Sequence, residues 1–145
     1  MARLPTPGGD DGNWGTVLNE YLGAEHNSDG THGLASGLVT DVVNTQSSVG
    51  ATYTLPAPTS AGIHYLTLTA SCTLTFPTAV ASQSFTLILK QGGSGSYTIT
   101  WPGTVKWNGG TAPTLSTTAG QIDVLSFFSP DGTNWFGFVS GQNMS

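Results

Sequence analysis

The stretch that decides the fold is Tyr65-Leu-Thr-Leu-Thr-Ala-Ser-Cys-Thr-Leu-Thr-Phe76. Apolar or small residues occupy the even positions from Leu66 to Phe76, and threonine or serine fills each odd position between them. Because successive side chains of a strand point to opposite faces, this pattern predicts β-structure with one buried face and one threonine face. The segment is long for a single strand, so a turn near Ala70–Cys72 is expected to divide it into two.

Further strands are predicted on both sides of glycine-rich and asparagine-rich turns. They cover residues 84–91, 96–101, 121–129 and 133–139, each with alternating apolar positions. Short strands that recur at intervals of roughly 8–14 residues are typical of sandwiches and barrels. Residues 51–145 are therefore predicted to form an all-β domain, either an antiparallel β-sandwich or a jelly-roll-like fold.

Residues 1–33 are predicted to form an arm of a different kind. The prolines and glycines of the segment 4–9 exclude a helix there, but the apolar residues that follow recur at helical spacing. A helix of about ten residues is too short to be stable alone in water, so its apolar stripe must pack on a partner. Residues 34–50 are predicted to be a linker, although their weak periodicity also fits a short helix. The residues expected to anchor the arm are Leu4, Trp14, Val17, Leu18, Tyr21 and Leu22.

Charged residues are scarce and unevenly placed. Only 8% of the 145 residues are charged, against roughly 25% in an ordinary soluble domain. Residues 1–50 carry a net charge of −5, from one arginine and six acids, and residues 51–145 are neutral, with two charges of each sign. Three cations cannot neutralise a run of phosphates, and no apolar run approaches the ~20 residues of a membrane span. We therefore expect no nucleic-acid and no membrane partner, and we expect the neutral domain to share surface with copies of itself or with a larger assembly.

Catalysis is not expected, and no catalytic residue is predicted. The β domain has two carboxylates, Asp123 and Asp131, whereas glycoside hydrolysis needs a pair at a defined separation. Asp131 is expected to bond to its own turn, and Asp123 to lie on the polar face of its strand. His64 is predicted to be solvated, and no Gly-x-Ser-x-Gly motif is present. Cys72 alternates in phase with apolar neighbours, so it is predicted to be a small core residue.

One polar turn, Glu25–His32, is the best candidate for a metal site. His26, Asn27, Asp29 and His32 offer nitrogen and oxygen ligands, but the turn lacks the spacing of an EF-hand and the thiolates of a structural zinc site. A turn that redirects the chain without a metal is the preferred interpretation. No cofactor is expected.

The tryptophans of the β domain divide into two groups. Trp101 and Trp135 follow apolar neighbours in phase and are predicted to lie in the core. Trp107, next to Asn108 and ahead of two glycines, is expected near the surface. There Trp107 and Asn108 could contact a glycan, because an aromatic face suits the apolar face of a pyranose, or they could pack on a neighbouring subunit.

Several segments of this sequence resemble a known protein family. The run Leu4-Pro-Thr-Pro-Gly-Gly-Asp-Asp-Gly-Asn-Trp-Gly-Thr-Val-Leu-Asn-Glu-Tyr-Leu22, followed by His26-Asn-Ser-Asp-Gly-Thr-His32, resembles the start of fibre and virion-surface proteins of tailed bacteriophages, especially of phages that infect actinobacteria. The C-terminal part resembles β domains of phage fibre and decoration proteins. The segments that carry this second resemblance are Tyr65–Pro77, Phe85–Gln91, Thr98-Ile-Thr-Trp-Pro102, Val105-Lys-Trp-Asn-Gly-Gly-Thr-Ala-Pro-Thr-Leu115 and Asp131-Gly-Thr-Asn-Trp135.

The resemblance implies a non-enzymatic structural protein of the virion surface, assembled in the host cytoplasm. It implies a homotrimer whose arm docks on the major capsid protein or another virion protein. Tail fibres of this family usually continue into long stalks, and because this chain stops at Ser145 we expect a capsid decoration protein, a minor capsid protein or a head fibre. The alternative is a tail-fibre module that attaches to the host by binding a cell-surface glycan.

Overall fold

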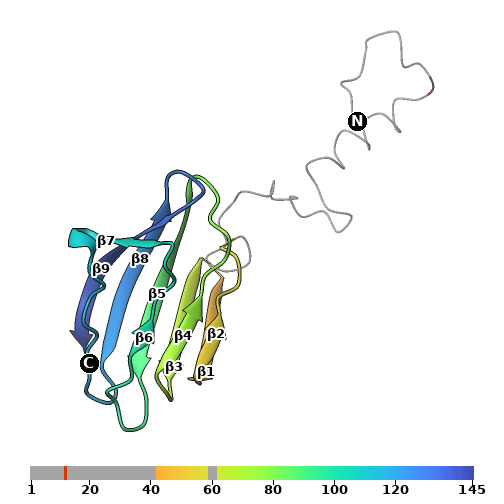
Figure 1. Cartoon of the computed structure of the whole chain (residues 1–145). Coiled ribbons are helices and arrows are strands. Elements are labelled where there is room, and N and C mark those ends of the chain that lie inside the picture. Colours follow the sequence, from red (N-terminus) through yellow and green to blue (C-terminus); the bar gives the residue numbers. More distant parts are fainter. Residues whose placement is uncertain (1–11, 13–41, 59–61) are drawn as a thin grey trace. The chain divides into compact units, whose positions relative to one another are not determined.

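The regular secondary structure in the described part of the chain is almost entirely β-strand. The computed structural model describes residues 12, 42–58 and 62–145 (Figure 1), and the contacts of the chain divide it into residues 1–39 and residues 40–145. The all-β prediction is confirmed for the described residues. They contain β1 (Val43–Val49), β2 (Thr52–Thr54), β3 (Ile63–Leu68), β4 (Cys72–Thr75), β5 (Gln83–Gln91), β6 (Ile99–Thr100), β7 (Val105–Trp107), the 3₁₀ turn η1 (Asn108–Gly110), β8 (Ile122–Ser129) and β9 (Trp135–Met144).

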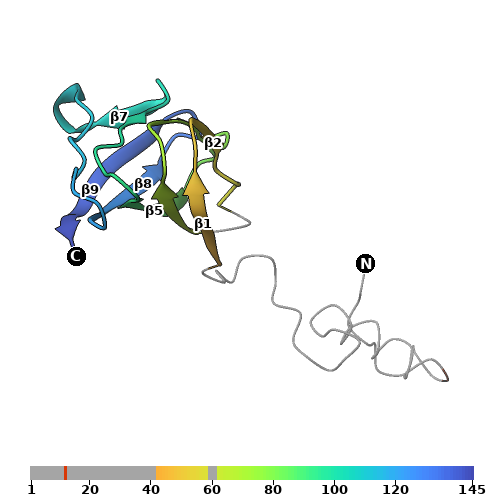
Figure 2. The same cartoon turned by 90° about the horizontal axis from the view of Figure 1, so that it is seen from below.

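The strands form a six-stranded sheet and a three-stranded sheet. The larger sheet has the order β1-β3-β5-β8-β9-β7, and the smaller has the order β2-β4-β6. In the larger sheet β1, β3 and β5 run parallel, β8 is antiparallel to both β5 and β9, and β7 is parallel to β9. The smaller sheet is parallel throughout. Figure 2 shows β1 and β7 on opposite sides of the domain, as expected for the two edge strands of the larger sheet.

The first six strands build three coils of a parallel β-solenoid. Each coil places one strand in the larger sheet, turns a corner and places the next strand in the smaller sheet. The corners also stack, because the Thr69 amide donates to the Val49 carbonyl and the Gly92 amide donates to the Leu68 carbonyl, both at 3.0 Å. A Cβ atom at Gly92 would collide with that Leu68 oxygen, so glycine is required for the third coil to stack this closely.

The alternating segment that opened the sequence is divided by a turn, as predicted. Its first half is β3, with Leu66 and Leu68 buried, and its second half is β4, with Cys72 and Leu74 buried. The threonines of β4 are exposed, as expected for the outer face. Because β3 and β4 belong to different sheets, their buried faces meet across the interior of the domain.

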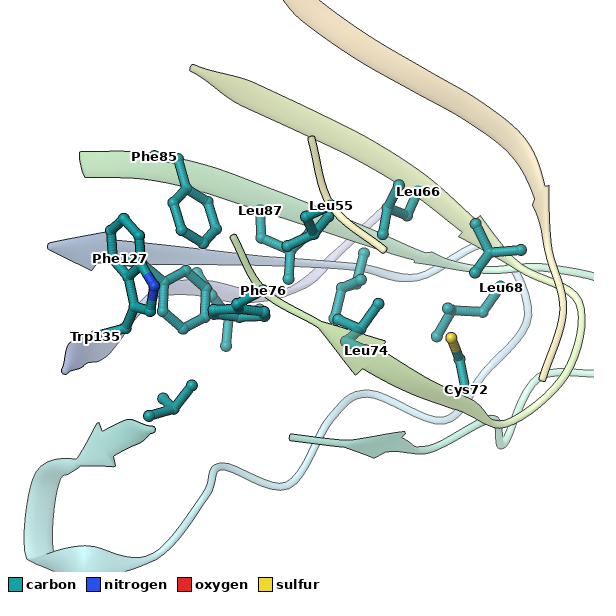
Figure 3. Packing of buried hydrophobic residues seen from close by; sticks show 14 of the residues in the cluster. Leu55, Leu66, Leu68, Cys72, Leu74, Phe76, Phe85, Leu87, Phe127 and Trp135 are labelled. Atoms are coloured by element: carbon teal, nitrogen blue, oxygen red, sulfur yellow. The ribbon is translucent and has the colours of Figure 1, made fainter. Parts of the chain in front are cut away.

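The core lies between the two sheets and contains an aromatic cluster (Figure 3). The Phe76 ring meets the rings of Phe85 and Phe127 edge-on, at centroid distances of 5.3 and 4.9 Å. Trp135, predicted to be a core residue, is 1% exposed and lies 4.9 Å from Phe85. Aromatic pairs of this geometry contribute about 0.5–1.5 kcal/mol each beyond the burial of their area.

Two expectations about the strands are corrected by the structure. The pairing is not wholly antiparallel: alternation identifies a strand but is the same in either direction, and each corner here sends the chain to the other sheet. Residues 43–49, expected within the linker 34–50, form β1 and pair with β3. The apolar pattern did not reveal β1 because polar Asn44 and Gln46 are half-buried and Val43 is 50% exposed, so that only Val49 at its end is a buried apolar residue.

Candidate functional site

The outer face of the larger sheet exposes large apolar side chains, and we call it the apolar face. Phe128 is 42% exposed and Phe138 is 54% exposed, and Phe136 on β9 lies directly opposite Phe128 on β8. These residues alternate with the buried residues of the same strands, so they point away from the core. Exposed apolar patches of this kind mark interaction surfaces. The apolar face comprises Ile63, Tyr65, Ile88, Val124, Phe128, Phe136 and Phe138, with Lys90 and Lys106 as its charged members.

The outer face of the smaller sheet is different, and we call it the threonine face. Thr52, Thr73 and Thr100 lie side by side in register on β2, β4 and β6, and all three are exposed. Thr54 and Thr75 form the next row. Neighbouring strands are about 4.8 Å apart, so the hydroxyl groups form a regular uncharged array.

Trp107, predicted to contact a glycan or a subunit, is only half-buried but is packed on the domain. Its ring covers Gly137 of β9, where a Cβ atom would lie 2.6 Å from the ring, and it meets Trp101 edge-on at 5.0 Å. Asn108 is exposed in η1, a turn that needs the positive φ of 66° at Gly109. The two residues therefore meet at the surface as predicted, but most of the tryptophan face is occupied by the domain itself. They line a shallow groove of about 340 Å³ together with Thr111, Pro113, Gly137, Phe138 and Val139.

A second groove, of about 260 Å³, adjoins the first at Pro113 and contains Trp101, which was predicted to lie in the core. Tyr97 and Trp101 are half-buried, pack on the edge of the core and line this groove. The side chains of Thr98 and Thr114 supply hydroxyl groups, and none of its lining residues is charged. Trp101 is in phase with apolar residues, and this predicted a core position. It directly follows β6, however, which is an edge strand of the smaller sheet, and alternation does not show which strands lie at an edge.

Asp123 is buried, which corrects the prediction that it lies on a polar face. It is 2% exposed and shares the inner face of β8 with Leu125 and Phe127. Its carboxylate accepts hydrogen bonds from the Ser116 amide at 2.7 Å and from the Ser116 hydroxyl at 2.6 Å. It also accepts one from the Asn143 amide at 3.2 Å. Asp123 thus ties the loop before β8 to the end of β9, which is a structural role.

Asp131 bonds to its own turn, as predicted. It accepts hydrogen bonds from the amides of Thr133 and Asn134 at 2.8 and 2.9 Å, and these bonds lower its pKa to about 2. Asp123 lies near the start of β8, whereas Asp131 lies beyond its end. Six residues of strand at ~3.4 Å each separate them by about 20 Å, roughly twice the largest spacing used by glycosidase pairs.

His64 is the largest departure from the sequence prediction. It was predicted to be solvated, yet it is 0% exposed and lies on the inner face of β3 with Leu66 and Leu68. Burial lowers the pKa of its imidazole. The even-numbered alternation that identified Leu66 includes position 64 as well, so the signal was present in the sequence.

Cys72 is a buried free cysteine, in agreement with its predicted core position, and burial raises the pKa of its thiol. Among the described residues, no group of three or more histidines, cysteines and acids could hold a metal ion. In the same part of the chain, no helix is long and apolar enough to cross a membrane. The metal-site candidate in the turn Glu25–His32 lies outside the described residues.

The predicted anchor of the arm also lies outside the described residues, and its six positions stay predictions. They are Leu4, Trp14, Val17, Leu18, Tyr21 and Leu22.

Comparison with known proteins gave no relative of this chain: no family model, no curated protein and no solved structure matches it.

Proposed function

We propose that this protein is a non-enzymatic structural component of the surface of a tailed-phage virion, a capsid decoration protein, head fibre or short fibre. In this proposal residues 1–33 dock on the major capsid protein or another virion protein. The β domain forms a homotrimer, and its two facing sheets favour a sandwich over a jelly roll. The proposal of a phage protein is supported by the motifs of residues 4–32 and of the C-terminal part, which resemble those of phage proteins. The proposal of self-association is supported by the surface of the β domain.

The observation that carries self-association is the apolar face. Phe128, Phe136 and Phe138 place exposed aromatic area on neighbouring strands, next to the half-buried Ile88 and Val124. Burying apolar area contributes about 25 cal/mol per Å², and this favours contact between copies through the apolar face. Residues 51–145 carry only four charges, and these are too few to keep copies of the domain apart in solution by charge repulsion.

The non-enzymatic part of the proposal is supported by the placement of the ionisable groups. Asp123 is saturated by hydrogen bonds, Asp131 is held in a turn, and His64 is enclosed in the core. None of the three lines the groove at Trp107 or the groove at Trp101.

Assembly onto particles tests the proposal. The full chain carrying Trp14→Ser and Leu18→Ser should keep its trimer mass by sedimentation but lose at least about 90% of its incorporation into virions, because an anchoring stripe acts through a few apolar residues. Asn19→Ser, a polar substitution in the same segment, is the matched control and should assemble normally. Full incorporation of the double variant into virions would contradict the proposed anchor. A monomeric mass of the unmodified protein in solution would contradict the proposed trimer.

A second candidate function, glycan binding by a tail-fibre module, is favoured by the groove at Tyr97 and Trp101. Aromatic side chains flanked by threonine hydroxyls and without charge suit a neutral pyranose. Thr114→Lys should obstruct this groove without disturbing the core, and Thr75→Lys on the threonine face is the matched control. Titration with host cell-wall polysaccharide should then show binding lost only in Thr114→Lys. No binding by the unmodified protein leaves the structural role alone.

A further inference from the structure

His64 connects the first coil of the solenoid to the rest of the domain. It lies on β3, fully enclosed, between β1 on one side and β5 on the other. On the β1 side, the side-chain nitrogen of Asn44 lies 3.3 Å from the imidazole Nδ1. On the β5 side, the Phe85 ring meets the imidazole edge-on at 5.5 Å.

The hydrogen bonds around Asn44 favour one tautomer of the neutral His64 ring. The Asn44 amide has two N–H groups, and one donates to the Tyr53 hydroxyl at 2.9 Å, which ties β1 to β2. The other faces His64, and a neutral ring that accepts this hydrogen bond at Nδ1 carries its proton on Nε2. The Asn44 oxygen is occupied by the Gln46 amide at 3.4 Å. The side chains of the first coil are thus arranged for an uncharged imidazole.

Among the described residues, the Nε2 atom has no hydrogen-bond partner, and it is completely buried. The polar and aromatic contacts of the ring come from Asn44 on β1, which also bonds Tyr53 on β2, and from Phe85 on β5. None of the charged residues of the described part, Lys90, Lys106, Asp123 and Asp131, bonds to the ring. Within the described part of the chain, no acidic side chain contacts the ring to stabilise an imidazolium.

We propose that His64 is an acid-released clasp that holds the first coil, β1 and β2, on the domain. Protonation makes Nδ1 a donor directed at the Asn44 amide, which is itself a donor, and places an unpaired charge in the core. β1 and β2 are edge strands with one neighbour each among the described strands, so they separate at lower cost than β5 or β8. The edges of β3 and β4 become free for pairing when the coil leaves.

The direction of the pH dependence follows from burial. The folded state disfavours the charged ring, so its pKa is lowered below the ordinary value of 6.5. Opened molecules therefore bind more protons than closed ones between the two values. The closed coil has its full stability above pH ~6.5 and loses stability as the pH falls below that value.

Hydrogen exchange of the full chain, corrected for the intrinsic rate at each pH, tests the clasp. Between about pH 7.5 and about pH 5, amides of β1 and β2 should lose protection by about tenfold or more, and those of β8 should keep theirs. In His64→Asn, a side-chain oxygen replaces Nδ1 as acceptor without titrating, and the pH effect should vanish. The double variant His26→Gln/His32→Gln removes the other histidines and should retain the effect.

Three results would overturn the clasp: the pH effect survives in His64→Asn, it disappears in His26→Gln/His32→Gln, or all strands lose protection together. If His64→Asn does not fold, the imidazole proton signal of His64 in the unmodified protein decides instead. That signal should titrate over the same pH range as the loss of β1 protection, and a midpoint at or above 6.5 would refute the proposal.

Discussion

The apolar face and the threonine face are both outer surfaces of sheets with the same inward packing, yet they differ in chemistry. Both sheets send leucine and phenylalanine into one shared core. Outward, the larger sheet presents Phe128, Phe136 and Phe138, and the smaller sheet presents rows of threonine. The core requires only the inward residues, so the outward residues are free to meet different partners. The proposed self-association accounts for this difference, since it would place other protein against the apolar face and leave the threonine face in water.

The largest expected effect is on association, and it separates the two faces directly. Phe138→Asp should weaken self-association at least about 100-fold, because an unpaired carboxylate in an interface costs several kcal/mol. Thr73→Asp, the same new charge on the threonine face, should leave the mass unchanged. Sedimentation equilibrium measures both, and equal association of the two variants would abolish the distinction between the faces.

A smaller effect, on the free energy of unfolding, is expected at Gly137 of β9, against which the Trp107 ring packs. A methyl group at Gly137 would press on the Trp107 ring, so Gly137→Ala should lower the free energy of unfolding by about 1–3 kcal/mol in urea. Gly103→Ala is the control, because a Cβ there has no atom within 4 Å, and it should change stability by less than about 0.5 kcal/mol. A loss in Gly137→Ala as small as the one expected for Gly103→Ala would mean that the Trp107 ring moves aside at little cost.

The smallest effect concerns hydroxyl groups on the two faces. The Ser71 oxygen accepts from the Thr98 amide at 3.1 Å and from the Thr98 hydroxyl at 3.2 Å, which ties β4 to β6 beside the threonine face. Ser71→Ala should therefore lower the free energy of unfolding by about 0.5–1.5 kcal/mol. Ser84→Ala, next to Phe128 in the larger sheet, should be nearly neutral. If thermal unfolding shows the reverse order, the hydroxyl groups of the smaller sheet are not part of its stability.

The sequence predicted the strands better than their partners. Alternation located β3, β4 and their dividing turn because it reports which side chains are buried. It does not report direction, and so parallel coils were interpreted as strands of an antiparallel β-sandwich or a jelly-roll-like fold. β1 was assigned to the linker because Asn44 and Gln46 occupy inward positions that normally hold apolar residues.

The candidate sites were predicted less well, and His64 and Asp123 show why. Both are in phase with buried neighbours, Leu66 and Leu125 respectively, but each was assigned to solvent because of its residue type. Their burial depends on partners that are distant in sequence: Asn44 for His64, and Ser116 with Asn143 for Asp123. Hydrogen bonds between residues so far apart in the sequence leave no local pattern from which the burial of a polar residue could be predicted.

The coiled course of the chain also sets how this domain can change in length. Residues in register on β1 and β3 are 20 positions apart, as Val43 and Ile63 show, and Thr52 on β2 is 21 positions before Thr73 on β4. Duplication of one such segment would add a strand to each sheet, about 4.8 Å of height, without changing any existing contact inside the core. Both outer faces would grow by one row at once. Duplication of a single stretch of about twenty codons would therefore enlarge the threonine face and the apolar face together.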